Sequence, residues 1–230
     1  MKRWLKKAGA ALSNYWYHYK WVTIITAFFV VVIGICVFQM AGEEPIDISA
    51  VYAGPEYLSE EAHHEIELSL EQIMPKDYDK DGKKSVQLID LLILSDEQIK
   101  ERDEQAKKED KAFIYDPTSR NSVMMSLGTY LSTGEAVLCF LDPYVYSQLE
   151  EKDAFVPLTE LLGYKPENAY DDYAVHISDV GSYKYYSALS YLPDDTLVCV
   201  KTRSYLYTTE EQIAYYERHL DYLRRLITLE

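Results

Sequence analysis

The chain has 230 residues, of which 48% are hydrophobic and 27% are charged, so its composition is that of a folded protein and excludes a globally disordered chain. This length accommodates one ordinary globular domain and one short additional segment. The 38 acidic residues outnumber the 23 Lys and Arg residues and give a formal net charge of −15. Because affinity for the phosphate backbone comes chiefly from Lys and Arg, this balance argues against a nucleic-acid partner.

The two ends of the chain differ in charge. No Asp or Glu precedes Glu43. The first twenty residues contain five basic side chains: Lys2, Arg3, Lys6, Lys7 and Lys20. The other 18 basic residues and all 38 acidic residues follow the apolar segment, so that part of the chain carries a net charge of −20. We therefore expect the two ends to face different environments.

Residues 22–41, VTIITAFFVVVIGICVFQMA, carry no charge. A helix of this length extends about 30 Å, which matches the hydrocarbon core of a bilayer. Because the basic residues precede this segment, the positive-inside rule places the N-terminus in the cytoplasm. The sequence thus predicts a single-pass protein of the cell membrane, with a basic cytoplasmic tail at 1–21, a transmembrane helix at 22–41 and an extracellular domain at 42–230.

Two other fates of the apolar segment stay open. A cleaved signal peptide also combines basic residues with an apolar run, but this run is longer than usual and no small-x-small site stands clearly at its end. A bacterial lipoprotein would be cleaved before Cys36, yet Ile35 occupies the position that needs a small residue. Residues 5–16 place apolar side chains at helical spacing and could lie on the inner leaflet, although we favour a simple topology signal.

The outer domain begins with a predicted strand, helix and strand. Residues 45–52 predict a strand that ends at Gly54. Ser59 is a suitable N-cap for a helix over residues 60–73. After a polar turn, residues 85–94, SVQLIDLLIL, are apolar enough for a strand in the centre of a sheet.

The rest of the domain continues this alternation. In order, we expect a charged exposed helix or mobile excursion at 96–111, a helix at 119–132 ended by Gly134, a strand at 136–141, a helix at 144–151, strands at 173–177 and 196–201, and a helix at 209–228. Alternating strands and helices predict an α/β fold with a mostly parallel sheet flanked by helices.

Residues 124–162 contain a helix that ends near a glycine, then a strand, then a short helix, and close with the segment FVPLTELL. This stretch resembles bacterial extracellular solute-binding proteins, whose corresponding strand leads to the region between two lobes. The resemblance implies a domain like one lobe of a type II solute-binding protein, because residues 43–230 suffice for about one lobe. The whole layout is similar to that of uncharacterised membrane-anchored proteins of Gram-positive anaerobes, which implies an architecture and no activity.

Asp77, Asp79 and Asp81 precede Gly82 and match the first half of a calcium loop, D-x-D-x-D-G. In that loop, alternate carboxylates surround a hard cation, and a bidentate Glu or Asp stands at the twelfth position. Here the twelfth residue is Leu88. The three carboxylates therefore predict either a weak calcium site or a solvated turn between a helix and a strand, and we favour the turn. No other cofactor is expected.

Two cysteines lie in apolar runs. Cys139 and Cys199 each follow a valine or leucine and precede an apolar residue, which is typical of buried thiols on core strands. A disulfide between them is feasible if their two strands are neighbours.

Other polar groups predict surface or capping roles. The adjacent His63 and His64 point about 100° apart on a helix, so we expect surface histidines rather than a metal pair. The carboxylate pairs at 171–172 and 194–195 stand in polar turns, where Asp caps the backbone. The nucleophile motif GxSxG and the phosphate-binding motifs GxxxxGK[ST] and GxGxxG are absent. The 22 Tyr residues suit core packing, which we favour, or a recognition surface.

Two functions from different classes follow. The first is a non-catalytic interaction or sensing domain that engages a membrane protein, another extracellular partner or an unidentified ligand, and it predicts a Tyr-rich face without a convergent polar pocket. The second is an extracellular hydrolase or metal-dependent enzyme with an unrecognised motif, and it predicts a deep pocket that collects Asp, Ser or His from several strand ends. The absence of a catalytic motif favours the first, so we expect no enzyme.

Overall fold

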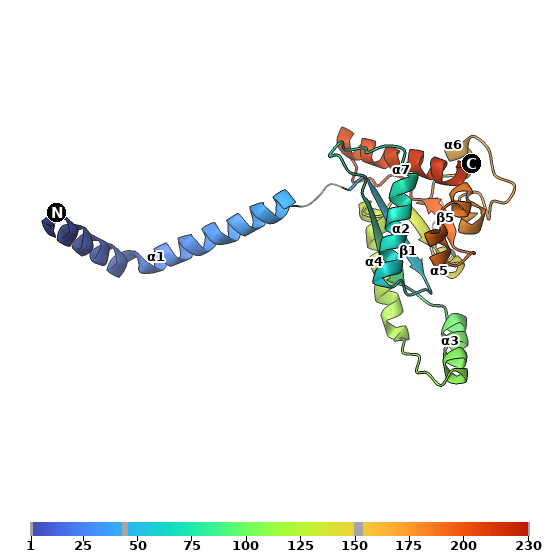
Figure 1. The fold of residues 1–230 in the computed structure, drawn as a ribbon, viewed down its shortest axis with the longest axis horizontal. Coiled ribbons are helices and arrows are strands. Elements are labelled where there is room, and N and C mark those ends of the chain that lie inside the picture. Colours follow the sequence, from blue (N-terminus) through green and yellow to red (C-terminus); the bar gives the residue numbers. More distant parts are fainter. Residues whose placement is uncertain (1, 43–45, 150–153, 230) are drawn as a thin grey trace. The chain divides into compact units, whose positions relative to one another are not determined.

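The computed structural model describes residues 2–42, 46–149 and 154–229 (Figure 1). The contacts divide the chain into two compact units, Met1–Glu44 and Pro45–Glu230. The described residues of the first unit form one helix, and the second unit is an α/β domain.

Helix α1 (Lys2–Gly42) runs without a break through the basic tail and the apolar segment. Within it, the 22 residues of Trp16–Val37 include an 18-residue window with a mean hydropathy of 2.3 and are long and apolar enough to cross a membrane. Most of the predicted transmembrane segment at 22–41 falls within this candidate span.

The α/β domain contains a five-stranded sheet in the order β2-β1-β3-β5-β4. The strands are β1 (Ile48–Gly54), β2 (Val86–Leu92), β3 (Leu138–Leu141), β4 (Val175–His176) and β5 (Leu197–Val200). Strand β1 pairs in parallel with β2 and β3, whereas β5 is antiparallel to both β3 and β4. The α/β prediction is confirmed, but the sheet is mixed rather than mostly parallel. The cause is the connection from β4 to β5, residues 177–196, which contains only short 3-10 turns and starts β5 at the end of the sheet where β4 finishes.

Strand β2 lies at an edge of the sheet, so its predicted central position is wrong. Its side chains alternate in burial, with Val86 and Leu88 buried and Gln87 exposed. Part of the apolar content that suggested a central strand belongs to Ile93 and Leu94, which are buried beyond the end of the strand. Strand β1, in contrast, is buried at all seven positions.

The described part of the domain contains six α-helices, of which all but α3 pack against the sheet. They are α2 (Glu60–Ile73), α3 (Asp96–Lys108), α4 (Arg120–Thr133), α5 (Pro143–Gln148), α6 (Leu158–Leu162) and α7 (Glu210–Thr228). The predicted bounds of α2 are confirmed, because Ser59 caps it by accepting a 3.2 Å hydrogen bond from the Ala62 N–H. Helix α4 ends as predicted at Gly134, whose φ of +85° suits a glycine. Part of the predicted helix at 144–151 lies outside the described residues.

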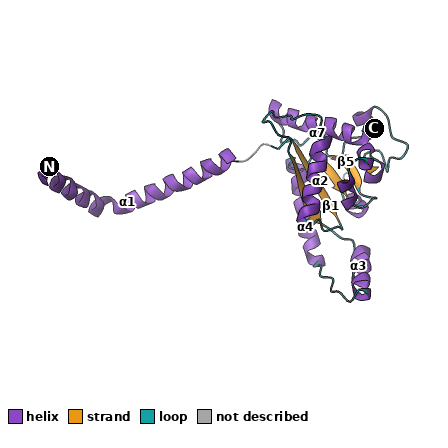
Figure 2. Ribbon diagram, viewed as in Figure 1, coloured by secondary structure: helices purple, strands orange, loops and turns teal. Residues whose placement is uncertain are grey.

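The strands of the sheet lie among the helices of the domain (Figure 2), and the core consists of two layers, one on each face of the sheet. Side chains alternate along β1, so that Ala50 and Tyr52 join one layer while Val51 and Ala53 join the other. The first layer is completed by α2, α6 and α7, and the second by α4 and α5. The sheet is therefore sandwiched between helices.

A buried histidine joins α7 to β1. The Nδ1–H of His219 donates to the Tyr215 carbonyl over 2.9 Å, and its Nε2 accepts the Ser49 N–H over 2.9 Å. Both ring nitrogens are thus satisfied by the neutral imidazole. Burial lowers the pKa of His219 to about 4, because the charged ring would have no water around it.

Cys139 and Cys199 are fully buried free thiols, which confirms their predicted place on core strands. They lie directly opposite each other on the neighbouring strands β3 and β5.

Candidate functional site

The carboxyl ends of β1 and β3 form a crevice at the edge of the sheet. The connections to the two neighbours of β1 run over opposite faces, because α2 packs in one core layer and α4 in the other. In open α/β sheets, ligands bind at this topological switch point, outside the carboxyl ends of the strands. The chain leaves β1 through Pro55 and Glu56 and leaves β3 through Asp142.

A cavity of about 620 Å³ opens at this place, and we call it the strand-end cleft. Its walls come from residues after β1, from α3 and the loop behind it, from Asp142 and from the turn before β5. Five carboxylates and two cations line it: Glu56, Glu101, Glu109, Asp142 and Asp195, with Arg102 and Lys111. The formal charge of the lining is therefore −3.

Asp142 is the buried polar group of the cleft, with 4% of its surface exposed. It caps α5 through a 2.8 Å hydrogen bond from the Tyr144 N–H to its Oδ1. Its Oδ2 accepts a 3.0 Å hydrogen bond from the side-chain amide of Gln98. Burial raises the pKa of Asp142, and the negative charge of Asp195 raises it further. A cation placed beside these two carboxylates would relieve both effects.

The two cations of the lining are already neutralised. The Arg102 guanidinium lies 2.5 Å from a Glu56 oxygen, and the Lys111 ammonium lies 2.7 Å from Glu109. The remaining carboxylates of the lining, those of Glu101, Asp142 and Asp195, form no ion pair with another described residue. The cleft consequently presents unpaired negative charge.

Tyr52 shapes the wall that follows β1. Its hydroxyl accepts the Glu56 N–H over 3.0 Å and so holds the turn that carries Glu56. A Cβ atom at Gly54 would lie 2.7 Å from this hydroxyl oxygen, so only glycine allows the ring to reach the turn. Burial raises the pKa of Tyr52 well above its usual value, which keeps the hydroxyl neutral.

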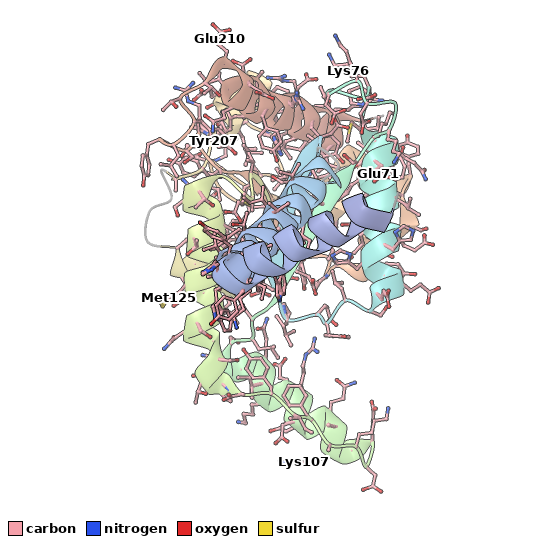
Figure 3. The ribbon with its side chains drawn as sticks, turned by 90° about the vertical axis from the view of Figure 1, so that its left-hand side faces the viewer. Glu71, Lys76, Lys107, Met125, Tyr207 and Glu210 are labelled. Carbon is pink, nitrogen blue, oxygen red and sulfur yellow. The ribbon has the colours of Figure 1, made fainter. Side chains whose placement is uncertain are left out.

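Helix α3 forms the outer wall of the cleft without entering the core. None of its residues is buried, which confirms the prediction of an exposed charged helix. Figure 3 shows its side chains, including that of Lys107, projecting outward. Polar contacts hold it at its N-terminal half: Gln98 to Asp142, Arg102 to Glu56, and Asp96 to Arg120 over 2.7 Å.

The sequence pattern did not single out this cleft. The only available signal was an Asp directly after an apolar strand, which is the position where parallel strands present ligand-binding groups. The polar turn at 194–195 predicts a capping role for Asp195, whereas the structure places this residue in the lining of the cleft. Asp171 does cap the backbone, as it accepts the N–H groups of Tyr173 and Ala174 over 2.8 and 3.0 Å.

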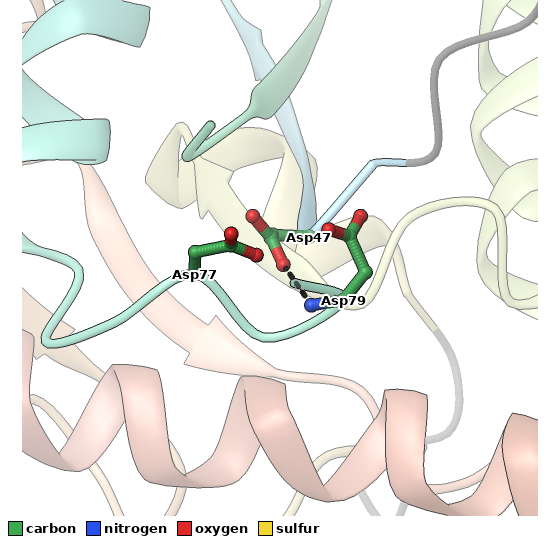
Figure 4. Close-up of side chains that lie close together, drawn as sticks. All are labelled: Asp47, Asp77 and Asp79. Carbon is green, nitrogen blue, oxygen red and sulfur yellow. Dashed lines mark hydrogen bonds between the residues drawn. The ribbon is translucent and has the colours of Figure 1, made fainter. Parts of the chain in front are cut away.

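The predicted calcium loop lies elsewhere, before the amino end of β2. Ligand oxygens of Asp77, Asp79 and Asp47 come within 4.8 Å of one another (Figure 4). Asp81 is not in this group, because its carboxylate accepts the Lys83 N–H over 2.8 Å in a local turn. Asp47 immediately precedes β1 and was missed, since 30 residues separate it from Asp77 in the chain.

Asp47 organises the loop as a buried anion. Its Oδ1 accepts the N–H groups of Tyr78 and Asp79 over 2.9 and 3.1 Å, and its Oδ2 accepts the Ser85 N–H over 3.3 Å. Arg218 on α7 lies 3.9 Å from the same carboxylate. These contacts are sufficient to fold the loop as a turn.

The two loop carboxylates differ in their partners. Asp77 accepts the N–H groups of Lys80 and Gly82, and despite some desolvation these bonds lower its pKa. Desolvation raises the pKa of Asp79, and the nearby carboxylates of Asp47 and Asp77 raise it further. The Asp79 Oδ2 has no hydrogen-bond donor among the described residues. These oxygens are of the kind that calcium prefers, so the weak calcium site stays a prediction alongside the turn.

The two adjacent histidines have separate environments. The ring of His63 contacts the Leu88 carbonyl over 2.7 Å and thereby joins α2 to the edge strand β2. His64 is exposed. In the part of the chain that the structure describes, neither belongs to a cluster of three ligands that could hold a metal ion.

The tyrosines lie both in the core, as predicted, and on the surface, where a recognition role stays a prediction. Tyr52, Tyr146 and Tyr222 are among the largest fully buried side chains, whereas Tyr57 and Tyr205 are 75% and 83% exposed.

Comparison with known proteins finds none that is similar to this chain. No family model matches the chain, and no curated protein or solved structure is significantly similar to it.

Proposed function

We propose that the chain is a single-pass membrane protein whose outer domain is a non-catalytic sensing domain, and that this domain binds a cationic ligand in the strand-end cleft. The observation that carries the proposal is the buried carboxylate of Asp142 at the switch point of the sheet, without a cationic partner. The proposed location is the cell membrane, with the domain extracellular.

The charge pattern around α1 supports this orientation. All five basic residues of the first unit precede most of the apolar segment, and Glu43 and Glu44 follow it. Positively charged flanks remain in the cytoplasm during insertion, so the domain after the span would face outward.

The charge of the cleft supports a cation as the ligand. The lining has a formal charge of −3, and its own two cations are occupied by Glu56 and Glu109. A primary amine or short polyamine could place ammonium groups between Asp142 and Asp195, and Phe113 offers an aromatic face for the same charge. The cavity volume of about 620 Å³ falls in the ordinary range for small-molecule sites.

The solute-binding-like character of the domain is part of this proposal. A single lobe has no second lobe to close over a ligand, but α3 stands opposite the strand ends and is held by polar contacts alone. We propose that α3 performs the enclosing role of the second lobe. A ligand bound between α3 and Asp142 would then restrain the helix, which is a change that a membrane partner could detect.

The cleft also bears on the choice between sensing and catalysis. A non-catalytic domain is predicted to lack a convergent polar pocket, and the cleft departs from that expectation. Its lining residues include no serine, cysteine or histidine, so the cleft offers no hydroxyl, thiol or imidazole for nucleophilic catalysis, and this favours binding. Its carboxylates are groups that also serve in acid–base catalysis, so a hydrolase is the alternative proposal.

The proposal is tested by titration calorimetry of the full chain in a mild detergent, with putrescine, spermidine and lysine as cations and with acetate and glucose as comparisons. Saturable binding of at least one cation, and of neither comparison compound, is the expected result. Asp142→Asn should weaken this binding about tenfold to a hundredfold, because a charge-assisted hydrogen bond contributes roughly 1.5–3 kcal/mol. Asn retains the cap of α5, so the variant should fold.

A matched pair of variants on α3 provides the control. Glu101 lines the cleft, whereas Glu104 on the same helix does not. Glu101→Gln should weaken cation binding and Glu104→Gln should leave it unchanged. If both variants behave alike, or if Asp142→Asn binds as tightly as the original chain, the ligand does not occupy this cleft.

A further inference from the structure

The two buried thiols of the domain form a cross-strand pair. Cys139 on β3 is the register partner of Cys199 on β5, and both belong to the same core layer. Both side chains are 0% exposed. Burial raises the pKa of the Cys199 thiol, and the neighbouring Cys139 thiol raises it further.

The register brings the Cα atoms of the pair within the reach of a disulfide. Lys201 N–H donates to the Val137 carbonyl over 2.9 Å, two residues away on each strand. Because hydrogen-bonded pairs recur every second residue in an antiparallel ladder, Cys139 and Cys199 also occupy a hydrogen-bonded pair. The Cα atoms of such pairs lie about 5.5 Å apart, within the range of about 4.4–6.8 Å that disulfides span. Their Cβ atoms lie about 5.5 Å apart, so bond formation draws the two side chains together by about 1 Å.

We propose that Cys139 and Cys199 are joined by a disulfide bond in the exported protein. This inference rests on the outer placement proposed above, since disulfides persist in oxidising compartments outside the cytoplasm. It goes beyond ligand binding, because it assigns a covalent modification to residues that do not line the cleft.

The oxidation takes place through thiol–disulfide exchange. A thiolate of one cysteine attacks the disulfide of a thiol oxidoreductase and forms a mixed disulfide, and the second cysteine then displaces the oxidoreductase. The chain loses two electrons and two protons, and the oxidoreductase leaves as a dithiol. Because both thiols are buried in the folded domain, the exchange occurs before β5 has packed against β3.

The bond would tie the carboxyl-terminal part of the domain to its centre. Fifty-nine residues lie between the two cysteines, and they include α5, α6, β4 and Asp195 of the strand-end cleft. Strand β5 has only four residues, so few ladder hydrogen bonds hold it otherwise. Closing a loop of this length restricts the unfolded chain far more than the folded one.

The test counts free thiols with a maleimide that adds a visible mass. Cells that produce the full chain are quenched in acid, and the protein is denatured, tagged and resolved on a gel, with and without prior reduction. Cys36 on α1 serves as an internal reference thiol. The expected result is one tag without reduction and three tags after reduction, with an intact mass lower by two hydrogens before reduction.

Two further experiments test the pairing of the two cysteines separately from the outer location of the domain. Cys139→Ser and Cys199→Ser should each show two tags with and without reduction. The purified full chain, unfolded in urea and refolded in detergent with oxidised and reduced glutathione, should return to one tag. Three tags after this refolding would overturn the pairing whatever the location of the domain. Three tags in cells but one after refolding would show that the two cysteines can pair but are not paired in the cell. This result would contradict the proposed disulfide and the proposed outer location of the domain.

Discussion

Acidification should destabilise the domain through His219. The buried ring is neutral, because its two nitrogens serve the Ser49 N–H as acceptor and the Tyr215 carbonyl as donor. Protonation would make Nε2 of His219 a donor that faces the Ser49 N–H donor, and it would place a charge in the core. The folded state therefore resists protonation, and the pKa of His219 falls from 6.5 to about 4.

The size of the effect follows from the two pKa values. Above pH 6.5 both states are neutral, and the favourable contribution of the neutral ring is fully present. As the pH falls below 6.5, the unfolded chain binds a proton that the folded chain does not, so the stability is lost progressively until about pH 4. Each unit of pKa difference corresponds to about 1.4 kcal/mol, so the total loss is about 3 kcal/mol, most of it complete by about pH 4.5.

Urea unfolding of the full chain in a mild detergent at pH 7.0, 5.5 and 4.5 measures this loss. All three Trp residues lie in the first 21 positions, so far-UV circular dichroism or Tyr fluorescence must report on the domain. Carboxylates titrate in the same range, so the informative quantity is the difference between variants. His219→Gln should remove about 2–3 kcal/mol of the pH dependence, whereas His64→Gln, on an exposed histidine, should remove none. Equal pH dependence in His219→Gln and in the original chain would refute the reasoning.

Three other predictions concern the turn glycine and the acidic loop. Gly134→Ala should destabilise the domain by about 1–3 kcal/mol in urea unfolding, because φ is +85° and the new Cβ would lie 2.5 Å from the Tyr207 hydroxyl oxygen. Gly128 lies in open space on α4, so the control Gly128→Ala should stabilise the domain by up to about 1 kcal/mol. Changes of the same sign in both variants would contradict this argument. Asp47→Ala should cost about 2–4 kcal/mol by the same measurement, since two or more buried N–H groups lose their acceptor, and a cost below about 0.5 kcal/mol would mean that water replaces it. If the loop is a turn, neither calcium nor EDTA should change the melting temperature; a rise with calcium that Asp79→Asn abolishes would identify a metal site instead.

Local signals were sufficient for the helices. The bounds of α2 and the end of α4 depend on a capping serine and on a glycine with positive φ, and both act within one turn of the chain. The exposed character of α3 was also readable, because a segment with so few apolar residues has nothing to bury. The candidate span of α1 likewise depends on composition alone.

The order and direction of the strands could not be predicted from local sequence signals in the same way. The apolar residues of β2 predicted a central strand, but its neighbour on one side is solvent, and part of that apolar content is buried outside the sheet. The short strands β4 and β5 showed an apolar run without a direction. Their antiparallel pairing depends on the end of the sheet at which the connection from β4 to β5 leaves the chain, which is a property of the whole fold.

By itself, the sequence determined an acidic α/β domain, the places where its helices begin and end, the buried thiols and one helix apolar enough to span a membrane. The tertiary structure decided which charges stand together. Glu56, Gln98, Asp142 and Asp195 are far apart in the chain and meet only at the carboxyl ends of β1 and β3, while Asp47 joins the acidic loop in place of Asp81. Capping and hydrophobic burial act on neighbouring residues and leave a pattern in the sequence, whereas convergence of charges arises from long-range strand pairing and leaves none.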